Sequence, residues 1–376
     1  AKTSAVTAVE QSVSNVEAAI TLSSSYSNST IGTNVYALLQ LVSNANSSSI
    51  KIKADKIDFT GFTTFLKASD LGASGTTSIV GVRGDIIARD SFYISTYHDI
   101  NDFAGMLCEK ITSLVAANGG MESIRSVGIS VPSGNYVTGC VENSPNMPWK
   151  GRIPLASMLR DRLGLAVGLG NDAHATAVGE AAYGVAHGMR NFIVVLLGNG
   201  GLGSCFLGVE GYAGEFGHTC YKVGGRKCSC GQEGCLEAYV SARGMIQTAR
   251  EILDQHPEMD SMLRRMPEMT MKILKQACEM EDKVALETVR YTSRILGMKL
   301  ANYASIVDPE AVILTGELAM FGKWMMPDLR ACFEENVFHN SRDKIELLFS
   351  DFDEGERDIL GASALAWTVK EYSLFK

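Results

Sequence analysis

One histidine and three cysteines lie within 18 residues in the stretch Gly214-Glu215-Phe216-Gly217-His218, followed by Cys228-Ser229-Cys230-Gly231 and Gly234-Cys235-Leu236-Glu237. Their spacing is His-x9-Cys-x-Cys-x4-Cys. Three thiolates and one imidazole make a complete tetrahedral ligand set for a structural zinc ion. Four unrelated loop positions are the alternative, but closed sets with such short spacings are rare by chance. The sequence therefore predicts a zinc site made by His218, Cys228, Cys230 and Cys235.

Two carboxylates accompany these ligands. Glu215 lies three residues before His218, and Glu237 lies two residues after Cys235. A purely structural zinc knuckle needs neither of them. We therefore expect the zinc to hold a loop still, so that the two carboxylates and the imidazole bind a polyhydroxylated ligand.

This zinc motif resembles that of the ROK family (repressors, open reading frames, kinases), and three further stretches carry the same resemblance. The first is Gly170-Asn171-Asp172-Ala173-His174-Ala175-Thr176-Ala177-Val178-Gly179-Glu180, with His174 where the family usually has Asn. The others are Asn146-Met147-Pro148-Trp149-Lys150-Gly151 and Leu360-Gly361-Ala362-Ser363-Ala364-Leu365-Ala366. The resemblance runs from about residue 79 to the end of the chain and is most specific over residues 125–240.

From Ser78 onward, segments with strand and helix patterns alternate, which favours α/β layers. The resemblance adds the arrangement: a two-lobed, actin-like or hexokinase-like ATPase fold with a zinc-bound loop and a cleft between the lobes. We expect an N-terminal coiled-coil and β extension over residues 1–72. A small lobe would follow from residues 73–168 plus 362–376, and a large lobe from residues 169–361.

The resemblance implies ATP-dependent phosphorylation of a hexose or N-acetylhexosamine at the 6-hydroxyl, with Mg²⁺ accompanying ATP. It makes Asp172 the general base that takes the proton of the attacking hydroxyl. Asp172 follows a predicted strand and precedes a predicted helix, and open α/β sheets bind ligands at the carboxyl ends of their strands. A helix N-cap is the alternative role for Asp172, although Asn171 could cap the helix equally well.

The same resemblance gives five residues that would hydrogen-bond the sugar hydroxyls: Asn146, Asn171, Glu215, His218 and Glu237. His218 would act twice, with one ring nitrogen on zinc and the other facing the sugar. Trp149 is expected to pack in its turn without contacting the ligand.

Three nucleotide-binding signatures depart from the family pattern. The opening Asp-x-Gly-Gly-Thr has its nearest counterpart in Asp70-Leu71-Gly72-Ala73-Ser74-Gly75-Thr76, for which a plain Gly/Ser turn is the alternative. The phosphate loop reads Leu197-Gly198-Asn199-Gly200-Gly201-Leu202-Gly203-Ser204, where Asn199 replaces Thr. The adenosine-side Gly-Gly pair reads Gly316-Glu317, and the Glu would crowd a polyphosphate and repel it. The expected cofactor-binding residues are Gly198, Asn199, Gly200, Gly201, Gly203, Gly316 and Asp70.

The connection from Ser204 to Glu215 is also shorter than the family's β-hairpin, a deletion that could misplace Glu215. These departures leave two alternatives to an active kinase open. One is a zinc-containing sugar-binding or sensor protein with weakened catalysis. The other is a chimera of a fibre segment and a kinase without a coherent active site.

The first fifty residues are rich in Ser, Asn, Thr, Ala and Val. Val6, Val9, Val13, Val16 and Ile20 follow the spacing of a coiled-coil seam, and residues 50–59 alternate like a half-buried strand. This segment resembles parts of phage tail or fibre proteins; an unordered leader before one hairpin is the alternative. A DNA-binding winged helix is not expected, because the first fifty residues contain one Lys and no Arg.

Bulk properties limit the remaining function classes. The net charge of −8 and a pI near 5.4 predict no nucleic-acid partner. No uninterrupted apolar run reaches the roughly 20 residues needed to cross a bilayer, so no membrane partner is expected. Nine cysteines, three of them assigned to zinc, indicate reduced thiols in a cytoplasmic protein. We expect a homo-oligomer: a dimer of kinase lobes, or a trimer if the coiled coil forms.

Overall fold

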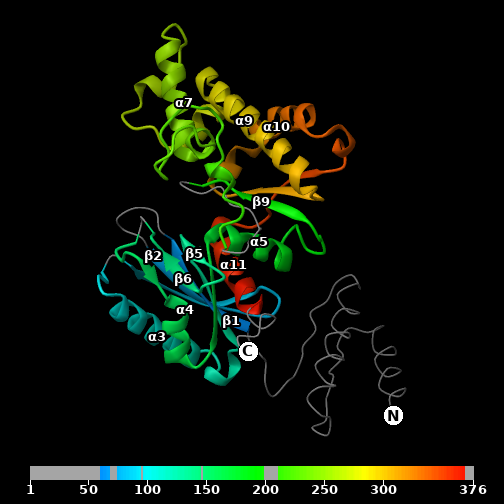
Figure 1. Cartoon of the computed structure of the whole chain (residues 1–376). Helices are drawn as coiled ribbons and strands as arrows, with labels where there is room; N and C mark the ends of the chain where they lie inside the picture. The colour runs from blue at the N-terminus through cyan, green and yellow to red at the C-terminus, as the bar shows by residue number, and fades with distance from the viewer. Residues whose placement is uncertain (1–59, 68–73, 95, 145–146, 199–210, 369–376) are drawn as a thin grey trace, which may run out of the picture. The chain divides into compact units, whose positions relative to one another are not determined.

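The computed structural model describes residues 60–67, 74–94, 96–144, 147–198 and 211–368 (Figure 1). The predicted coiled-coil seam and the alternating stretch at residues 50–59 lie outside the described residues and stay predictions. The described residues form two lobes, each built on its own sheet, which confirms the two-lobed fold.

The sheet of the small lobe has the strand order β3-β2-β1-β4-β8. β1 pairs antiparallel with β2 and parallel with β4, while β2–β3 is antiparallel and β4–β8 parallel. The bounds of the strands are β1 Thr60–Lys67, β2 Ser74–Val80, β3 Ile86–Tyr93, β4 Ser126–Ser130 and β8 Ala166–Gly170.

Helices cover this sheet and bury its inner strand β4. α3 (Ile100–Ala116) and α4 (Leu155–Leu163) contribute Phe103 and Leu159 to a core shared with Val127 of β4. α11 (Glu354–Thr368) packs so closely on β4 that a Cβ at Gly128 would lie 1.8 Å from the carbonyl oxygen of Ala362. Cover by helices explains why every residue of β4 is buried.

Two boundaries differ from the sequence expectation. β1 lies within the predicted N-terminal extension, residues 1–72, but Phe62 pairs with Val127 of β4, so the sheet already begins at Thr60. Its partner strand is more than fifty residues away, and no local pattern reveals such a pairing. The predicted boundary between the large and small lobes at residues 361 and 362 falls inside one helix, because α11 runs from Glu354 to Thr368.

The sheet of the large lobe is parallel, in the order β11-β10-β9. Its strands are β9 Phe192–Leu196, β10 Ala311–Thr315 and β11 Glu346–Phe349. The remaining core comes mainly from four helices and one short one: α7 Ala242–Gln255, α8 Met271–Glu279, α9 Lys283–Val307, α10 Gly322–Asn336 and α6 Glu237–Val240.

α5 (Asp172–Tyr183) packs against both α11 and β9. Its contact with α11 depends on small residues, because a Cβ at Gly361 would lie 2.7 Å from the backbone of Ala175. A third, small sheet has the order β5-β6-β7, with bounds Gly134–Asn135, Cys140–Glu142 and Arg152–Ile153. Val141 of β6 belongs to the small-lobe core.

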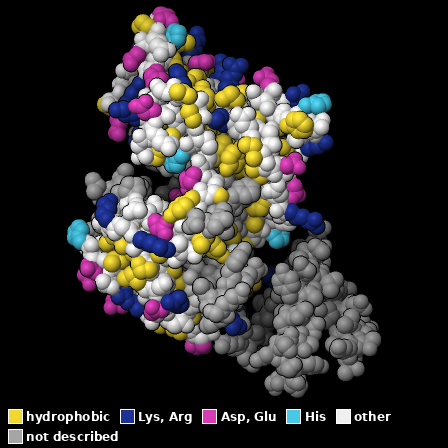
Figure 2. All heavy atoms as spheres, in the orientation of Figure 1, with side chains coloured by type: hydrophobic (Ala, Val, Ile, Leu, Met, Phe, Trp, Pro, Cys, Tyr) yellow, Lys and Arg dark blue, Asp and Glu magenta, His cyan; other side chains and the backbone are white. Residues whose placement is uncertain are grey.

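On the visible face of the molecule, acidic and basic side chains are interspersed (Figure 2). Of the helices that the structure describes, none has the length and apolar character needed to cross a membrane.

Candidate functional site

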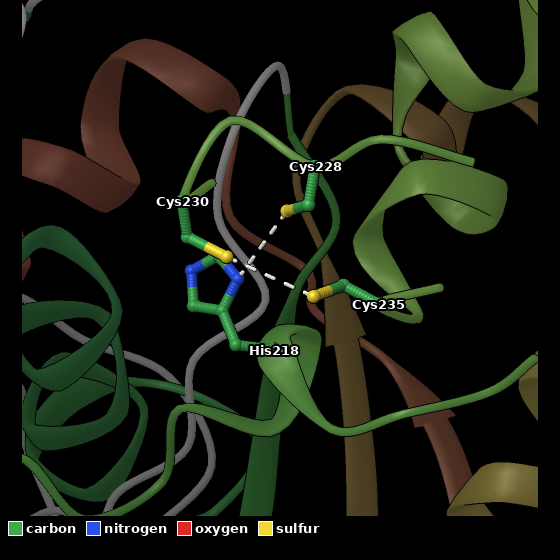
Figure 3. Close-up of side chains that lie close together, drawn as sticks. All are labelled: His218, Cys228, Cys230 and Cys235. Carbon is green, nitrogen blue, oxygen red and sulfur yellow. Dashed lines mark hydrogen bonds between the residues drawn. The ribbon is translucent and has the colours of Figure 1, made fainter. Parts of the chain in front are cut away.

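The structure brings the four predicted metal ligands together. One ligand atom from each of His218, Cys228, Cys230 and Cys235 lies within 4.8 Å of the others, and Figure 3 shows the three sulfur atoms converging on the imidazole. Cys230 Sγ lies 3.7 Å from Cys235 Sγ, and Cys228 Sγ lies 3.6 Å from His218 Nδ1.

These separations fit a tetrahedral zinc ion. Zinc–sulfur bonds of about 2.3 Å give a tetrahedron whose edges are about 3.8 Å long. The donor set of three thiols and one imidazole is also the chemistry that structural zinc prefers. His218 would bind through Nδ1, which leaves Nε2 facing away from the sulfur atoms.

Arg226 holds the loop that carries two of these cysteines. Its guanidinium donates to the carbonyl oxygens of Ala238 and Gly244, both at 3.0 Å, and pairs with Glu251 Oε2 at 2.5 Å. It also lies 4.6 Å from the centroid of the Tyr239 ring. The loop is therefore fixed to α6 and α7 on the N-terminal side of Cys228.

Two carboxylates face the free side of the His218 ring. His218 Nε2 lies 3.9 Å from Glu215 Oε2 and 3.8 Å from Glu237 Oε2. Glu237 Oε1 accepts a hydrogen bond from Ser229 at 2.9 Å, while Oε2 is buried and has no hydrogen-bond partner among the described residues. A buried carboxylate oxygen without a partner is costly, which fits an atom that meets a hydroxyl-bearing ligand.

Asn171 and Asp172 occupy the junction between β8 and α5. Asn171 Oδ1 accepts a hydrogen bond from the His174 backbone N–H at 2.6 Å and is the N-cap of α5. Asp172 is the first helical residue, and its Oδ1 accepts from the Ala173 backbone N–H at 2.9 Å. The capping role considered for Asp172 is therefore filled by Asn171.

The charges of Asp172 and Glu237 both act on the pKa of Glu215. Burial raises the pKa of the Asp172 carboxyl, while hydrogen bonding to Ala173 and the positive charge of Arg357 oppose the rise. Partial burial also raises the pKa of Glu215; His218 lowers it, and the negative charges of Asp172 and Glu237 raise it further. Glu215 and Glu237 therefore lie beside the imidazole of His218, and Asp172 is near enough for its charge to act on Glu215.

Gly316 lies against the end of β9. It has φ +96°, and a Cβ there would lie 2.5 Å from the carbonyl oxygen of Leu197, the residue before Gly198. A Cβ at Gly198 would meet none of the described residues within 4 Å. Asp70, Asn199, Gly200, Gly201, Gly203 and the predicted sugar contact Asn146 lie outside the described residues.

Two other residues of the quoted motifs are packing residues. The Trp149 ring is buried, with its centroid 4.6 Å from that of Phe103, as expected. His174 is also buried; it contacts the Tyr136 ring edge-on at 5.2 Å, and its Nδ1 has no hydrogen-bond partner among the described residues. Burial lowers the pKa of His174 to about 4.

Sequence reasoning missed a polar cluster beside this site. Glu142 on β6 accepts hydrogen bonds from Asn135, Thr138 and Tyr212, and pairs with Arg152. Tyr212 belongs to the connection that leads to Glu215. No sequence pattern joins the residues of this cluster, because Glu142 and Tyr212 are seventy positions apart.

The two lobes and the site define an actin-like, hexokinase-like protein with a Cys/His motif in its large lobe. The sequence model of the ROK family matches residues 70–369, so the chain belongs to the ROK family.

Its relatives include both enzymes and regulators. The chain is 32% identical over 222 residues to a glucokinase of Streptomyces coelicolor, covering 55% of this chain and 70% of that protein. It is 30% identical over 226 residues to a xylose repressor of Caldicellulosiruptor bescii, covering 58% of this chain and 56% of that protein. Among solved structures, a ROK family glucokinase from Streptomyces griseus, in complex with glucose and AMPPNP, superposes with a TM-score of 0.64 at 25% identity. That match covers 82% of this chain and 100% of the other.

Proposed function

We propose that this protein transfers the γ-phosphoryl group of Mg-ATP to the 6-hydroxyl of a hexose or N-acetylhexosamine, with Asp172 as the general base. The observation that carries the proposal is the placement of Glu215 and Glu237 beside His218, with Asp172 near enough for its charge to act on Glu215. The matches to a glucokinase and to a glucokinase complex with glucose and AMPPNP support the same reaction.

The position of Asp172 suits the proposed base. Phosphoryl transfer needs positioning, charge stabilisation and one group that accepts the proton of the nucleophile. Because Asn171 caps α5, Asp172 is not required for that task. Burial raises the pKa of Asp172 and so makes its carboxylate a better proton acceptor.

Amides, carboxylates and an imidazole would hold the sugar. The polar atoms of Glu215, Glu237 and His218 Nε2 lie close together. Sugar hydroxyl groups can pair with them, because a hydroxyl both donates and accepts hydrogen bonds. Asn146 and Asn171 complete the proposed set. Zinc, held by His218, Cys228, Cys230 and Cys235, would keep the imidazole tautomer and the loop fixed.

The nucleotide would lie against the glycines that end β9 and β10. Gly316 lies there against Leu197, the residue before Gly198, and residues 199, 200, 201 and 203 follow in the same proposed phosphate loop. The family match begins at Asp70, which supports the assignment of Asp70-Leu71-Gly72 to the opening phosphate segment. In this proposal the protein works in the cytoplasm, as a dimer or trimer, without nucleic acid.

A sugar-responsive regulator without turnover is the second candidate. The specific observation in its favour is Glu317 directly after Gly316, which adds negative charge where polyphosphate would approach. The similarity to a xylose repressor points in the same direction.

Thermal unfolding separates the two candidates. A kinase is expected to be stabilised both by its sugar and by Mg-AMPPNP, because each ligand binds only the folded state. A regulator of the second kind would respond to the sugar alone. A rise of the unfolding temperature with sugar, combined with no response to Mg-AMPPNP at millimolar concentration, would exclude the kinase proposal.

A further inference from the structure

The carboxylate of Glu142 accepts hydrogen bonds from several neighbouring side chains. Its side chain is 12% exposed, and it accepts from Thr138 Oγ1 at 3.0 Å and from Asn135 Nδ2 at 3.3 Å. Arg152 Nε lies 3.3 Å from Glu142 Oε1. These contacts hold the Glu142 carboxylate in one orientation. The backbone beside it is fixed too, because the neighbouring Val141 belongs to the small-lobe core.

The connection from the large lobe reaches this carboxylate. The Tyr212 hydroxyl donates to Glu142 Oε2, and this hydrogen bond lowers the pKa of Glu142 and raises that of Tyr212. Gly211 lies against Asn135 with φ +80°, where a Cβ would come within 2.7 Å of Asn135 Oδ1. A side chain at position 211 would therefore push the connection away from β5 and β6.

Glu215 lies between two fixed points of the chain. On one side is Tyr212, bound to Glu142; on the other is Phe216, which is 3% exposed in the large-lobe core with its ring 4.7 Å from that of Tyr303. Only Ala213 and Gly214 separate Tyr212 from Glu215, and Gly214 has φ +88°. The chain thus passes from the small-lobe anchor at Tyr212 to the large-lobe anchor at Phe216, and Glu215 lies between them.

We propose that Tyr212 is a positioning residue: its hydrogen bond to Glu142 holds Glu215 in place for sugar binding. This inference rests on the proposed function. It accounts for the placement of Glu215 beside His218 at the end of a connection that is shorter than the family's hairpin. Without the hydroxyl of Tyr212, Glu215 would sample several positions, and each sugar-binding event would have to order it again.

Tyr212→Phe tests the proposal, because it removes one oxygen and keeps the ring. The expected result is a rise of the sugar KM by about tenfold, with kcat and the KM for ATP unchanged within about twofold. Tyr93→Phe, at a 68% exposed tyrosine on β3, is the matched control and should change nothing. Loss of folded protein would instead lower the apparent kcat at constant KM. Because loss of the metal would also raise the sugar KM, a content of one zinc per chain in Tyr212→Phe is the second control.

A double-mutant cycle with Glu142→Ala, which removes the acceptor, assigns the effect to this pair. If the hydrogen bond is responsible, the sugar KM of the double variant should equal that of the more impaired single variant. Effects that multiply, or a sugar KM unchanged in Tyr212→Phe, would overturn the proposal.

Hydrogen exchange gives a readout that needs no turnover. Amides of residues 213–218 should exchange faster in Tyr212→Phe than in the wild type, while those of β10 stay unchanged. If the amides of residues 213–218 exchange faster in Tyr212→Phe but the wild type shows no kinase activity, the positioning contact is supported and only the proposed kinase function is refuted. Unchanged exchange of residues 213–218 would refute the positioning contact whatever the activity.

Discussion

Asn171 caps α5 through a 2.6 Å hydrogen bond from the His174 backbone N–H to its Oδ1, and Asp172 follows it as the first helical residue. The two neighbours divide the tasks of the β8–α5 junction. Asn171 satisfies a backbone donor at the helix terminus, and Asp172 supplies a carboxylate whose pKa is raised by burial. A carboxylate kept partly desolvated costs stability, which is typical of a group retained for chemistry.

Asp172→Asn is therefore expected to stabilise the fold at neutral pH. A carboxyl whose pKa is higher in the folded than in the unfolded state favours folding at low pH, and this contribution is lost as the pH rises through the folded-state pKa. At pH 7 the variant should unfold at a higher urea concentration than the wild type, and the difference should shrink at pH 4. A variant less stable than the wild type at pH 7 would contradict a desolvated Asp172.

For His174 we expect the opposite pH dependence: its contribution to stability is lost as the pH falls. Its pKa is lowered to about 4 by burial, against about 6.5 in an unfolded chain. The neutral ring contributes fully above pH 6.5, and its contribution is lost as the pH falls from 6.5 to 4, by up to about 3 kcal/mol. His174→Asn should flatten the fall of the urea midpoint over this range. Equal falls in both proteins would show that His174 is charged in the folded state.

Removal of the metal should weaken the site loop and the sugar contacts together. The expected content is one zinc per chain by elemental analysis, and Cys228→Ser should lose it, because three remaining ligands bind zinc far more weakly. Cys332→Ser, a cysteine on α10 outside the cluster, is the control and should keep its zinc. Zinc retained by Cys228→Ser and lost by the control would place the ion elsewhere.

Arg226→Met should loosen the same loop without touching a ligand. The change removes the Arg226 donor from the carbonyl oxygens of Ala238 and Gly244, although Thr248 Oγ1 still donates to Gly244, and we expect a cost of about 2 kcal/mol. We expect a lower unfolding temperature and faster zinc release to a chelator. Arg243→Met, at an exposed arginine on α7, should behave like the wild type. Equal rates of zinc release in the two variants would argue against the anchoring role of Arg226.

The sequence was most informative where function lies in short motifs. The four metal ligands are within 18 residues, and their convergence follows from spacing and ligand chemistry alone. The strand before Asp172 and the helix after it were likewise predictable, because hydrophobic patterns and capping residues act locally.

Long-range pairings could not be predicted in this way. β1 joins β4 by backbone hydrogen bonds that any residue types can make, so its residues were assigned to the separate extension over residues 1–72. The Glu142–Tyr212 contact joins two side chains whose proximity depends on how the lobes fold. Without a motif, such a pair is visible only in three dimensions.

The central claim is tested most directly by ADP release from Mg-ATP with zinc-loaded protein and a panel of glucose, mannose, fructose, N-acetylglucosamine and N-acetylmannosamine. The account predicts turnover that depends on one or more of these sugars and falls about 10²- to 10⁴-fold in Asp172→Asn, the range that a general base contributes. Folded, zinc-loaded protein that turns over none of them, or an Asp172→Asn variant as active as the wild type, would contradict it.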